Sequence, residues 1–324
     1  MEQKRALLII NPISGTSKKT GLDRKVTERL AREEITVTTR WTERAGHATE
    51  LARQGVAEGY DMVIAAGGDG TINETAVGLL DSGTAMGIIP CGSGNGLARH
   101  LNIPVNVGGA LEVIAAGRSE VCDSGSVNGR PFFCTFGMGF DAEVSHRFAN
   151  SGKRGLVTYV RSTVATLMHY KPQTVAISFD GKPEVTERVF TLAVCNASQY
   201  GNNAYIAPKA LITDGLLDVT VFHPSNKLRT SLVSLDLMAG SIDKNILIDT
   251  YRVKEVTIRR QSEGPAHIDG EPLMLPAELH VKVRPGSLRV FTPAANRRII
   301  PVVTPVKSMI RGAGYSVRDL FKGK

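Results

Sequence analysis

The stretch VIAAGGDGTINE, residues 63–74, runs from an apolar segment into two glycines, one acid, a third glycine and the start of a helical pattern. Glycines carry no side chain, so a ligand can approach the main chain closely. The N–H groups at a following helix start carry partial positive charge, which suits phosphate. Taken alone, the same stretch is equally well explained as a tight turn with Thr71 capping a helix.

Strand-like and helix-like segments alternate over the first third of the chain. Strands are predicted at 5–10, 36–42, 61–66 and 84–89, and helices at 24–34, 48–58 and 71–80. This alternation predicts a mostly parallel sheet with helices on its faces. Ligands of such sheets lie beyond the carboxyl ends of the strands.

The pattern changes near residue 126, where β-rich runs such as PFFCTF and RVFTLAVCNAS are separated by turn residues. Helical patterns interrupt these runs at 155–170 and 226–240. We therefore predict a second, largely antiparallel domain, with the boundary near Ser124.

Three strand ends in the first domain carry unusual turns: NPISG (11–15), GGDGT (67–71) and PCGSGNG (90–96). Three such turns on one sheet edge favour a phosphate site that needs no lysine. Asp69 is informative, because a carboxylate among glycines repels phosphate unless a cation or a ligand hydroxyl compensates. We therefore expect Asp69 to organise magnesium or a hydroxyl.

Other phosphate-binding patterns fit less well. The chain has no GxxxxGK[ST] motif and lacks the protein-kinase signature set. GMGFDA (137–142) matches GxGxxA, but the acid expected about 20 residues later would fall in a helical pattern. A dinucleotide fingerprint is therefore disfavoured.

Composition describes an ordinary globular chain of 324 residues with a formal charge of +8. The four cysteines show neither disulfide nor metal spacing, which fits a reducing cytoplasm. Nowhere do about 18 apolar residues run together. The positive charge favours polyanions in general, and no basic stripe interleaved with aromatic residues indicates nucleic acid.

Six ordered motifs that span nearly the whole chain resemble the diacylglycerol kinase catalytic-domain superfamily, which includes bacterial lipid kinases and sphingosine kinases. The motifs are NPISG, GGDGTINE, PCGSGNGLARHL, FGMGFDAEV, ALITDGLLDV and HIDGEP. The resemblance implies an N-terminal α/β ATP-binding domain, a C-terminal β-sandwich domain for the lipid substrate, and an active site in the cleft between them. It assigns 1–124 with a returning segment 287–324 to the first domain and 125–286 to the second.

The resemblance also implies site residues. Glu271 of HIDGEP would accept the proton of the attacking hydroxyl, Asp269 would be a second candidate base or magnesium partner, and Asp69 would complete the catalytic set. Asp-Gly alone is more often only a hairpin turn. The implied ATP contacts are Asn11, Thr42, Gly67, Gly68, Asp69, Gly70, Thr71, Ile72, Asn73 and Ser93.

A structural magnesium ion is implied at ALITDGLLDV. Its ligands would be the Asp214 carboxylate and the carbonyls of Leu211 and Leu216. From the residues alone, Asp214-Gly215 simply turns the chain into the next strand.

The expected function is a magnesium-dependent kinase that moves the γ-phosphoryl of ATP to the hydroxyl of a diacylglycerol or a sphingoid base. GSGNGLA is closer in spelling to the sphingosine-kinase branch. Two alternatives stay open: phosphorylation of a soluble acceptor, as by an NAD kinase, and a non-catalytic nucleotide- or lipid-binding module. A lipid acceptor implies a cytoplasmic protein with peripheral contact at the inner membrane face, and a homodimer is left open. The basic segment 297–324 is expected to form an amphipathic helix that either docks on the first domain or contacts lipid headgroups.

Overall fold

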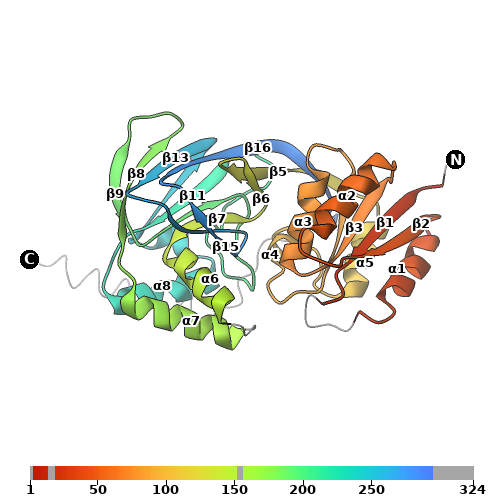
Figure 1. Ribbon diagram of the computed structural model, residues 1–324, viewed down its shortest axis with the longest axis horizontal. Coiled ribbons are helices and arrows are strands. Elements are labelled where there is room, and N and C mark those ends of the chain that lie inside the picture. The colour runs from red at the N-terminus through yellow and green to blue at the C-terminus, as the bar shows by residue number, and fades with distance from the viewer. Residues whose placement is uncertain (1–2, 14–18, 152–155, 295–324) are drawn as a thin grey trace, which may run out of the picture.

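The computed structural model describes residues 3–13, 19–151 and 156–294. Two halves of the chain lie side by side along the long axis, with the N-terminal half at the right of Figure 1. The predicted amphipathic helix in 297–324 lies outside the described residues.

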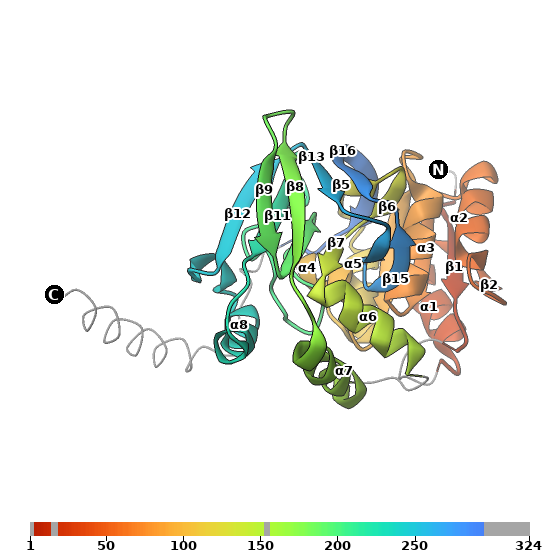
Figure 2. The same cartoon turned by 60° about the vertical axis from the view of Figure 1, so that its left-hand side comes forward.

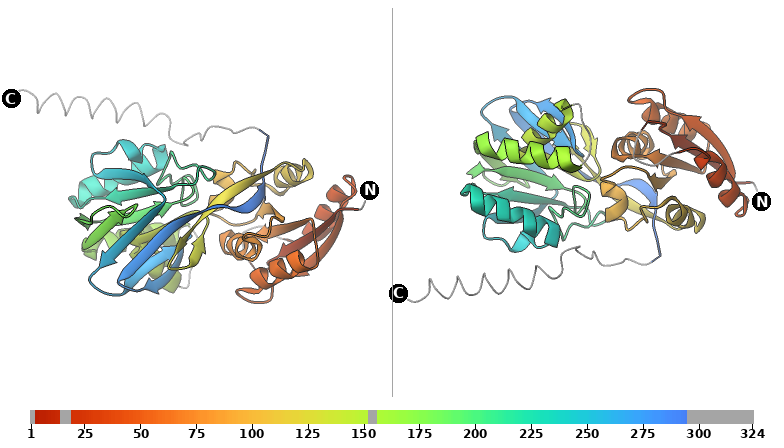
Figure 3. Two further views of the ribbon diagram at one scale, coloured as in Figure 1. Left: turned by 90° about the horizontal axis from the view of Figure 1, so that it is seen from above. Right: turned by 90° about the horizontal axis from the view of Figure 1, so that it is seen from below.

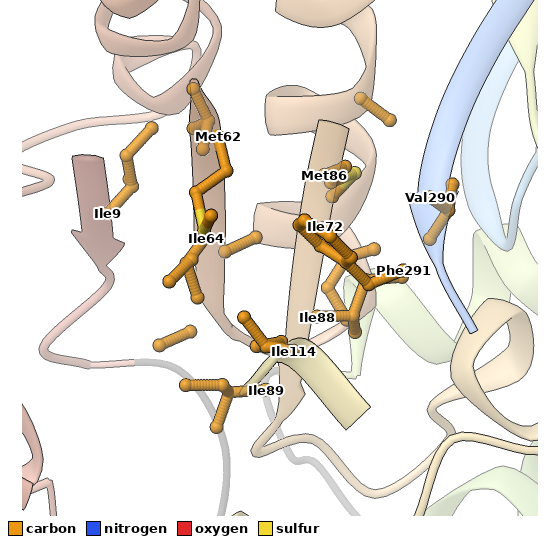
Figure 4. Close-up of a cluster of buried hydrophobic side chains, with 14 of the residues drawn as sticks. Ile9, Met62, Ile64, Ile72, Met86, Ile88, Ile89, Ile114, Val290 and Phe291 are labelled. Atoms are coloured by element: carbon orange, nitrogen blue, oxygen red, sulfur yellow. The ribbon is translucent and has the colours of Figure 1, made fainter. Parts of the chain in front are cut away.

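The N-terminal half contains the predicted parallel sheet. Its strands follow the order β2-β1-β3-β4, and all neighbouring pairs run parallel. The elements are β1 (Arg5–Ile10), α1 (Leu22–Ala31), β2 (Thr36–Trp41), α2 (His47–Ala57), β3 (Met62–Gly67), α3 (Asp69–Leu79), β4 (Ala85–Pro90), α4 (Gly96–His100) and α5 (Val107–Ala115). Every residue of β3 and β4 is buried, as expected for strands covered on both faces. Figure 4 shows Ile64, Met86 and Ile88 packed with Ile72 of α3 and Ile114 of α5.

The C-terminal half contains an antiparallel sheet of six strands in the order β12-β11-β10-β7-β14-β15. A second hydrophobic core fills the space between this sheet and the strands β8, β13 and β16 (Glu278–Phe291). The elements are β7 (Thr135–Gly139), α6 (Phe140–Asn150), α7 (Leu156–His169), β8 (Gln173–Phe179), β9 (Val185–Val189), β10 (Thr191–Cys195), β11 (Leu217–Phe222), α8 (Lys227–Ala239), η1 (Ile242–Lys244), β12 (Ile248–Val253), β13 (Glu255–Arg260), β14 (Gly264–Ile268) and β15 (Glu271–Leu275). The predicted two-part α/β and β-sandwich fold is confirmed.

Two long strands join the halves. β5 (Ser119–Val127) pairs with the short β6 (Arg130–Phe132) and with β16 (Glu278–Phe291). The start of β16 pairs antiparallel with β13, and its end pairs parallel with β4 through Arg289 and Val290. Val290 and Phe291 therefore enter the N-terminal core, as Figure 4 shows.

The proposed domain boundaries, near 124 and 287, fall inside these paired strands. The β5–β16 register shifts between Arg284 and Leu288, and Gly286 there has a φ of 60°. Asp123 accepts the Gly286 N–H at 2.8 Å and so fixes this bulge. We propose that the halves meet at a hydrogen-bonded ladder with a local kink, because no linker separates them here.

Candidate functional site

The three turns meet at one edge of the parallel sheet, and of the first turn the structure describes residues 11–13. They follow β1, β3 and β4, which are neighbours and point the same way. Asn11 joins the first turn to the second, because its Nδ2 donates to Thr71 Oγ1 at 3.1 Å. The third turn is tied to the second where the Cys91 N–H donates to the Gly67 carbonyl at 2.8 Å. The alternating pattern of strands and helices placed these turns correctly.

Asp69 ties the second turn to the third. It lies in the first turn of α3, and its two carboxylate oxygens accept the N–H groups of Asn95, at 2.9 Å, and Gly96, at 2.7 Å. A Cβ at Gly94 would lie 2.8 Å from Asp69 Oδ2, so a glycine leaves room for this contact. The Asp69 carboxylate therefore holds the shape of residues 92–96.

The other residues expected at the nucleotide have different surroundings. Thr42 is buried at the end of β2, where its N–H donates to the Ile10 carbonyl at 2.9 Å. Ser93 is exposed on the third turn. The Ile72 side chain is buried in the N-terminal core, so only its main chain is free of that packing. The Asn73 side chain contacts the other half of the molecule, where its Nδ2 donates to Asp269 Oδ2 at 3.1 Å.

The acid turn, residues Asp269 to Glu271, is a β-hairpin. β14 ends at Ile268 and β15 begins at its paired residue Glu271, and Asp269 and Gly270 form the connection with φ values of 50° and 86°. Two positive φ values match the turn that favours Asp-Gly between twisted strands. The hairpin interpretation of this segment is therefore correct, but it does not exclude a second role.

Asp269 is held by hydrogen bonds from both halves. Its carboxylate accepts the consecutive N–H groups of residues 133–135 at 2.7–2.8 Å. Asn73 of α3 adds a fourth donor, with Nδ2 at 3.1 Å from Asp269 Oδ2. These donors also explain why the predicted run PFFCTF is divided into β6 and β7. Burial raises the pKa of Asp269 to about 6, although the backbone donors counteract it.

Glu271 faces the glycine turn. Its Oε1 lies 3.2 Å from the position that a Cβ on Gly70 would take. Among the described residues, none donates a hydrogen bond to the Glu271 carboxylate. Its pKa is raised by desolvation, and the nearby Glu74 carboxylate raises it further. The turn 67–71 and the acid turn, predicted separately, thus meet at the junction of the two halves.

A buried polar cluster behind the acid turn was missed by the sequence argument. His267 is 2% exposed, and its Nε2 lies 3.1 Å from Asp141 Oδ2. Tyr200 donates its hydroxyl to the same oxygen at 2.8 Å. The Gly270 N–H points to His267 Nδ1 at 3.4 Å, so this ring supports the turn that presents Glu271. The signal was present in GMGFDA and HIDGEP, but nothing in sequence joined the two.

Replacing Gly137 by alanine should disrupt this cluster. A Cβ there would lie 2.2 Å from His267 Nε2 and 2.4 Å from Asp141 Oδ2. We expect the free energy of unfolding to fall by about 1–3 kcal/mol, measured by chemical denaturation. Gly108→Ala is the matched control, because its Cβ would meet only Asn106 Oδ1 at 3.6 Å. Equal stability of the two variants would contradict the assigned role of Gly137.

Lys19 is a second residue that the sequence argument missed. It is 7% exposed at the first turn, where Nζ donates to the Asn11 carbonyl. Burial lowers the pKa of this amine. The sequence did not single out Lys19, because a lysine in an otherwise polar loop gives no sign of burial; the expectation that the turns bind phosphate without a lysine stays a prediction.

The residues proposed for a structural magnesium ion fit a cation poorly. The Asp214 carboxylate pairs with the Arg252 guanidinium through one oxygen and accepts the Leu216 N–H through the other, at 3.0 Å. Arg252 therefore already neutralises the one carboxylate that this site would offer to a cation. Leu211 is exposed beside this loop.

Comparison with known proteins follows the same division of the chain. Residues 5–127 match the family model described as diacylglycerol kinase catalytic domain, and residues 135–292 match the YegS C-terminal NAD kinase beta sandwich-like domain. A diacylglycerol kinase of Bacillus subtilis (strain 168) is 30% identical over 281 residues, which cover 85% of this chain and 92% of that protein.

Solved structures share the fold. A putative diacylglycerol kinase from Bacillus anthracis str. Sterne aligns with a TM-score of 0.74 over 91% of this chain and 99% of its own, at 22% identity. An NAD kinase from Archaeoglobus fulgidus in complex with ATP aligns with a TM-score of 0.50 over 89% of this chain and 94% of its own, at 14% identity. Among the described helices, none is long and apolar enough to cross a membrane.

Proposed function

Because the chain belongs to the diacylglycerol kinase catalytic-domain superfamily, a family of lipid kinases, we propose that it transfers the γ-phosphoryl group of ATP to a lipid hydroxyl. The observation that carries this proposal is the contact between the glycine turn 67–71 and the acid turn at the junction of the halves. Phosphoryl transfer needs a positioned phosphate chain and a base for the attacking hydroxyl. The two turns offer these two functions from opposite sides.

In this proposal the three turns hold the triphosphate of ATP. Main-chain N–H groups near Gly67, Gly68 and Gly70 contact the phosphates, and the Asp69 carboxylate keeps the third turn in place. Asn11, Thr42, Thr71 and Ser93 line the rest of the nucleotide site, and Ile72 contributes only its main chain. Magnesium carried by the nucleotide would neutralise phosphate charge, with Asp69 as the proposed partner beside the phosphates.

Glu271 is the proposed proton acceptor. Its carboxylate is free of hydrogen bonds from the described residues and lies beside Gly70, whereas Asp269 is occupied by four donors. Desolvation raises the pKa of Glu271, which makes the carboxylate a stronger base. Asp269 is then the positioning residue that fixes the hairpin on both halves.

The class of acceptor is tested by incubating the protein with labelled ATP and either a total lipid extract or soluble acceptors that include NAD. We expect label in the lipid phase, and mass spectrometry of the product would identify a phosphorylated diacylglycerol or sphingoid base. Label in NAD without lipid or detergent would support the alternative soluble acceptor. ATP binding without any transfer would support a non-catalytic module.

The pH dependence of turnover follows from the raised carboxyl pKa values. Glu271 must be ionised to accept a proton, and its pKa is raised by desolvation and by Glu74, so kcat should begin to fall at a pH above the usual 4.5 of a glutamate. Glu74→Gln removes the neighbouring negative charge, lowers the pKa of Glu271, and should move this acid limb to lower pH. A limb that stays at the ordinary glutamate value in the unaltered protein would contradict the assignment.

A further inference from the structure

Helix α8 exposes a stripe of leucines. Leu228, Leu232 and Leu235 are 74%, 53% and 40% exposed. Their spacing of four and three residues places them on one face of the helix. Thr230 and Val233 on the opposite side are buried against the C-terminal half. The leucines therefore leave a large part of their apolar surface in contact with solvent.

Helix α7 also carries exposed apolar side chains, and its end lies near the start of α8 (Figures 2 and 3). The Lys227 Nζ of α8 donates to the Met168 carbonyl of α7 at 3.1 Å. Val164 and Met168, four residues apart on α7, are each 56% exposed. At the other end of α8, Asn245 bonds to Asp236, and the adjacent Ile246 is 87% exposed. We call the six residues Val164, Met168, Leu228, Leu232, Leu235 and Ile246 the α7–α8 surface.

Basic side chains border the α7–α8 surface. Lys227 and Arg229 are exposed on either side of Leu228, about 100° away around the helix. Further exposed basic residues lie close in sequence to Val164, Met168 and Ile246: Arg161, Lys171 and Lys244. The acid of α8, Asp236, is engaged by Asn245 and Ser241. The sequence of α7, residues 156–169, contains no acid.

We propose that the α7–α8 surface docks on an anionic lipid bilayer. Apolar side chains on one helix face with lysine and arginine at its margins suit the boundary between acyl chains and negative headgroups. The lysine and arginine side chains can reach the phosphates while their aliphatic parts lie along the apolar stripe. This inference rests on the proposed function in one respect: a lipid acceptor gives the docking its purpose.

Charge argues against two other occupants of this surface. In a symmetric dimer formed through the α7–α8 surface, the basic margins of both copies would face each other. The segment 297–324 carries seven lysines and arginines and one acid, so covering the surface with it would also bring like charges together. An anionic bilayer is the occupant whose charge is complementary.

The test is co-sedimentation of the full chain with vesicles, without nucleotide or acceptor. We expect binding to vesicles of phosphatidylglycerol and phosphatidylcholine and little binding to phosphatidylcholine alone. Leu228→Gln/Leu232→Gln should weaken partitioning by roughly tenfold or more. Lys227→Glu/Arg229→Glu should weaken it by roughly thirtyfold or more and remove the preference for anionic lipid.

Matched variants on the N-terminal half serve as controls. Lys25→Glu/Arg32→Glu makes the same change of net charge on two exposed residues, one in α1 and one at its C-cap. Val105→Gln alters an apolar side chain that is also exposed. Both should bind vesicles like the unaltered chain, and denaturation curves should show that all variants are folded. Equal binding by the α7–α8 variants, or no binding to anionic vesicles by the unaltered chain, would overturn the proposal.

Two further measurements separate the remaining outcomes. Sedimentation velocity without lipid should give the same mass for the unaltered chain and Leu228→Gln/Leu232→Gln. A dimer that these substitutions dissociate, with no vesicle binding, would assign the surface to a second copy and overturn the proposal. The second measurement is kinase activity with labelled ATP. The surface variants should retain the activity of the unaltered chain toward a short-chain, dispersed lipid acceptor and lose activity toward the same kind of acceptor held in vesicles. If the kinase proposal is wrong, neither acceptor will be phosphorylated, whereas the difference in vesicle binding between the unaltered chain and the surface variants will remain.

Discussion

Replacing Glu271 by glutamine is expected to lower kcat by about 10²–10⁴-fold while ATP still binds. Glutamine keeps the size of the side chain but cannot accept a proton at neutral pH. The Glu271 carboxylate receives no hydrogen bond from the described residues, so the substitution leaves no donor unpaired. Initial rates with labelled ATP give kcat, and equilibrium binding of ATP shows that the donor site is intact.

The control for this variant is Glu263→Gln, an exposed residue just before the same hairpin. It should leave kcat and ATP affinity unchanged. Asp269→Asn should differ from both, because it places an amide among four donors and therefore lowers stability together with turnover. Near-normal turnover by Glu271→Gln would remove the proton-acceptor role from this residue.

Replacing Asp69 by asparagine is expected to weaken ATP binding by about 10- to 100-fold, because it removes a charge-assisted hydrogen bond of about 1.5–3 kcal/mol. In the unaltered chain, the two carboxylate oxygens of Asp69 accept the N–H groups of Asn95 and Gly96. Asparagine offers one acceptor and directs an amide donor at the other N–H. The third turn should then lose its shape, and turnover should fall with affinity.

Asp23→Asn is the matched control, because Asp23 also lies in the first turn of a helix, α1. Among the described residues, no N–H group of the sheet-edge turns donates a hydrogen bond to the Asp23 side chain. ATP affinity should therefore stay unchanged in this variant. Isothermal titration with ATP measures both variants. Equal affinity in Asp69→Asn and the unaltered chain would show that Asp69 does not shape the nucleotide site.

The sequence predicted the parallel sheet and the place of its three turns because these features depend on short-range patterns. Apolar runs such as 61–66 alternate with helical spacing, and parallel strands must present their carboxyl ends at one edge. Segment ends were less accurate: α1 begins at Leu22 and ends at Ala31, where 24–34 was predicted, and α3 begins at Asp69 rather than Thr71. Helix ends depend on capping contacts that a hydrophobic pattern does not contain.

In the candidate site, too, short-range features could be predicted from the sequence and long-range contacts could not. Glycine turns and the Asp-Gly hairpin were visible in the sequence, because each depends on backbone conformation at a few neighbouring residues. The partners of their acids were not visible. Asp69 was expected to face a cation or a hydroxyl, and its oxygens accept N–H groups 26 and 27 residues away. His267 and Asp141, 126 residues apart, meet only because β14 pairs with β7 and a glycine stands between them.

By itself, then, the sequence determined the two-part fold and the residue types at its turns, since hydrophobic periodicity and glycine conformations act over a few residues. Only the tertiary structure decided which acid is held and which is free. Asp269 is fixed by donors from residues 133–135 and Asn73, and Glu271 lies opposite Gly70. The physical reason is that hydrogen bonding and desolvation, which set the chemistry of a carboxylate, depend on groups that the chain brings together only after it folds.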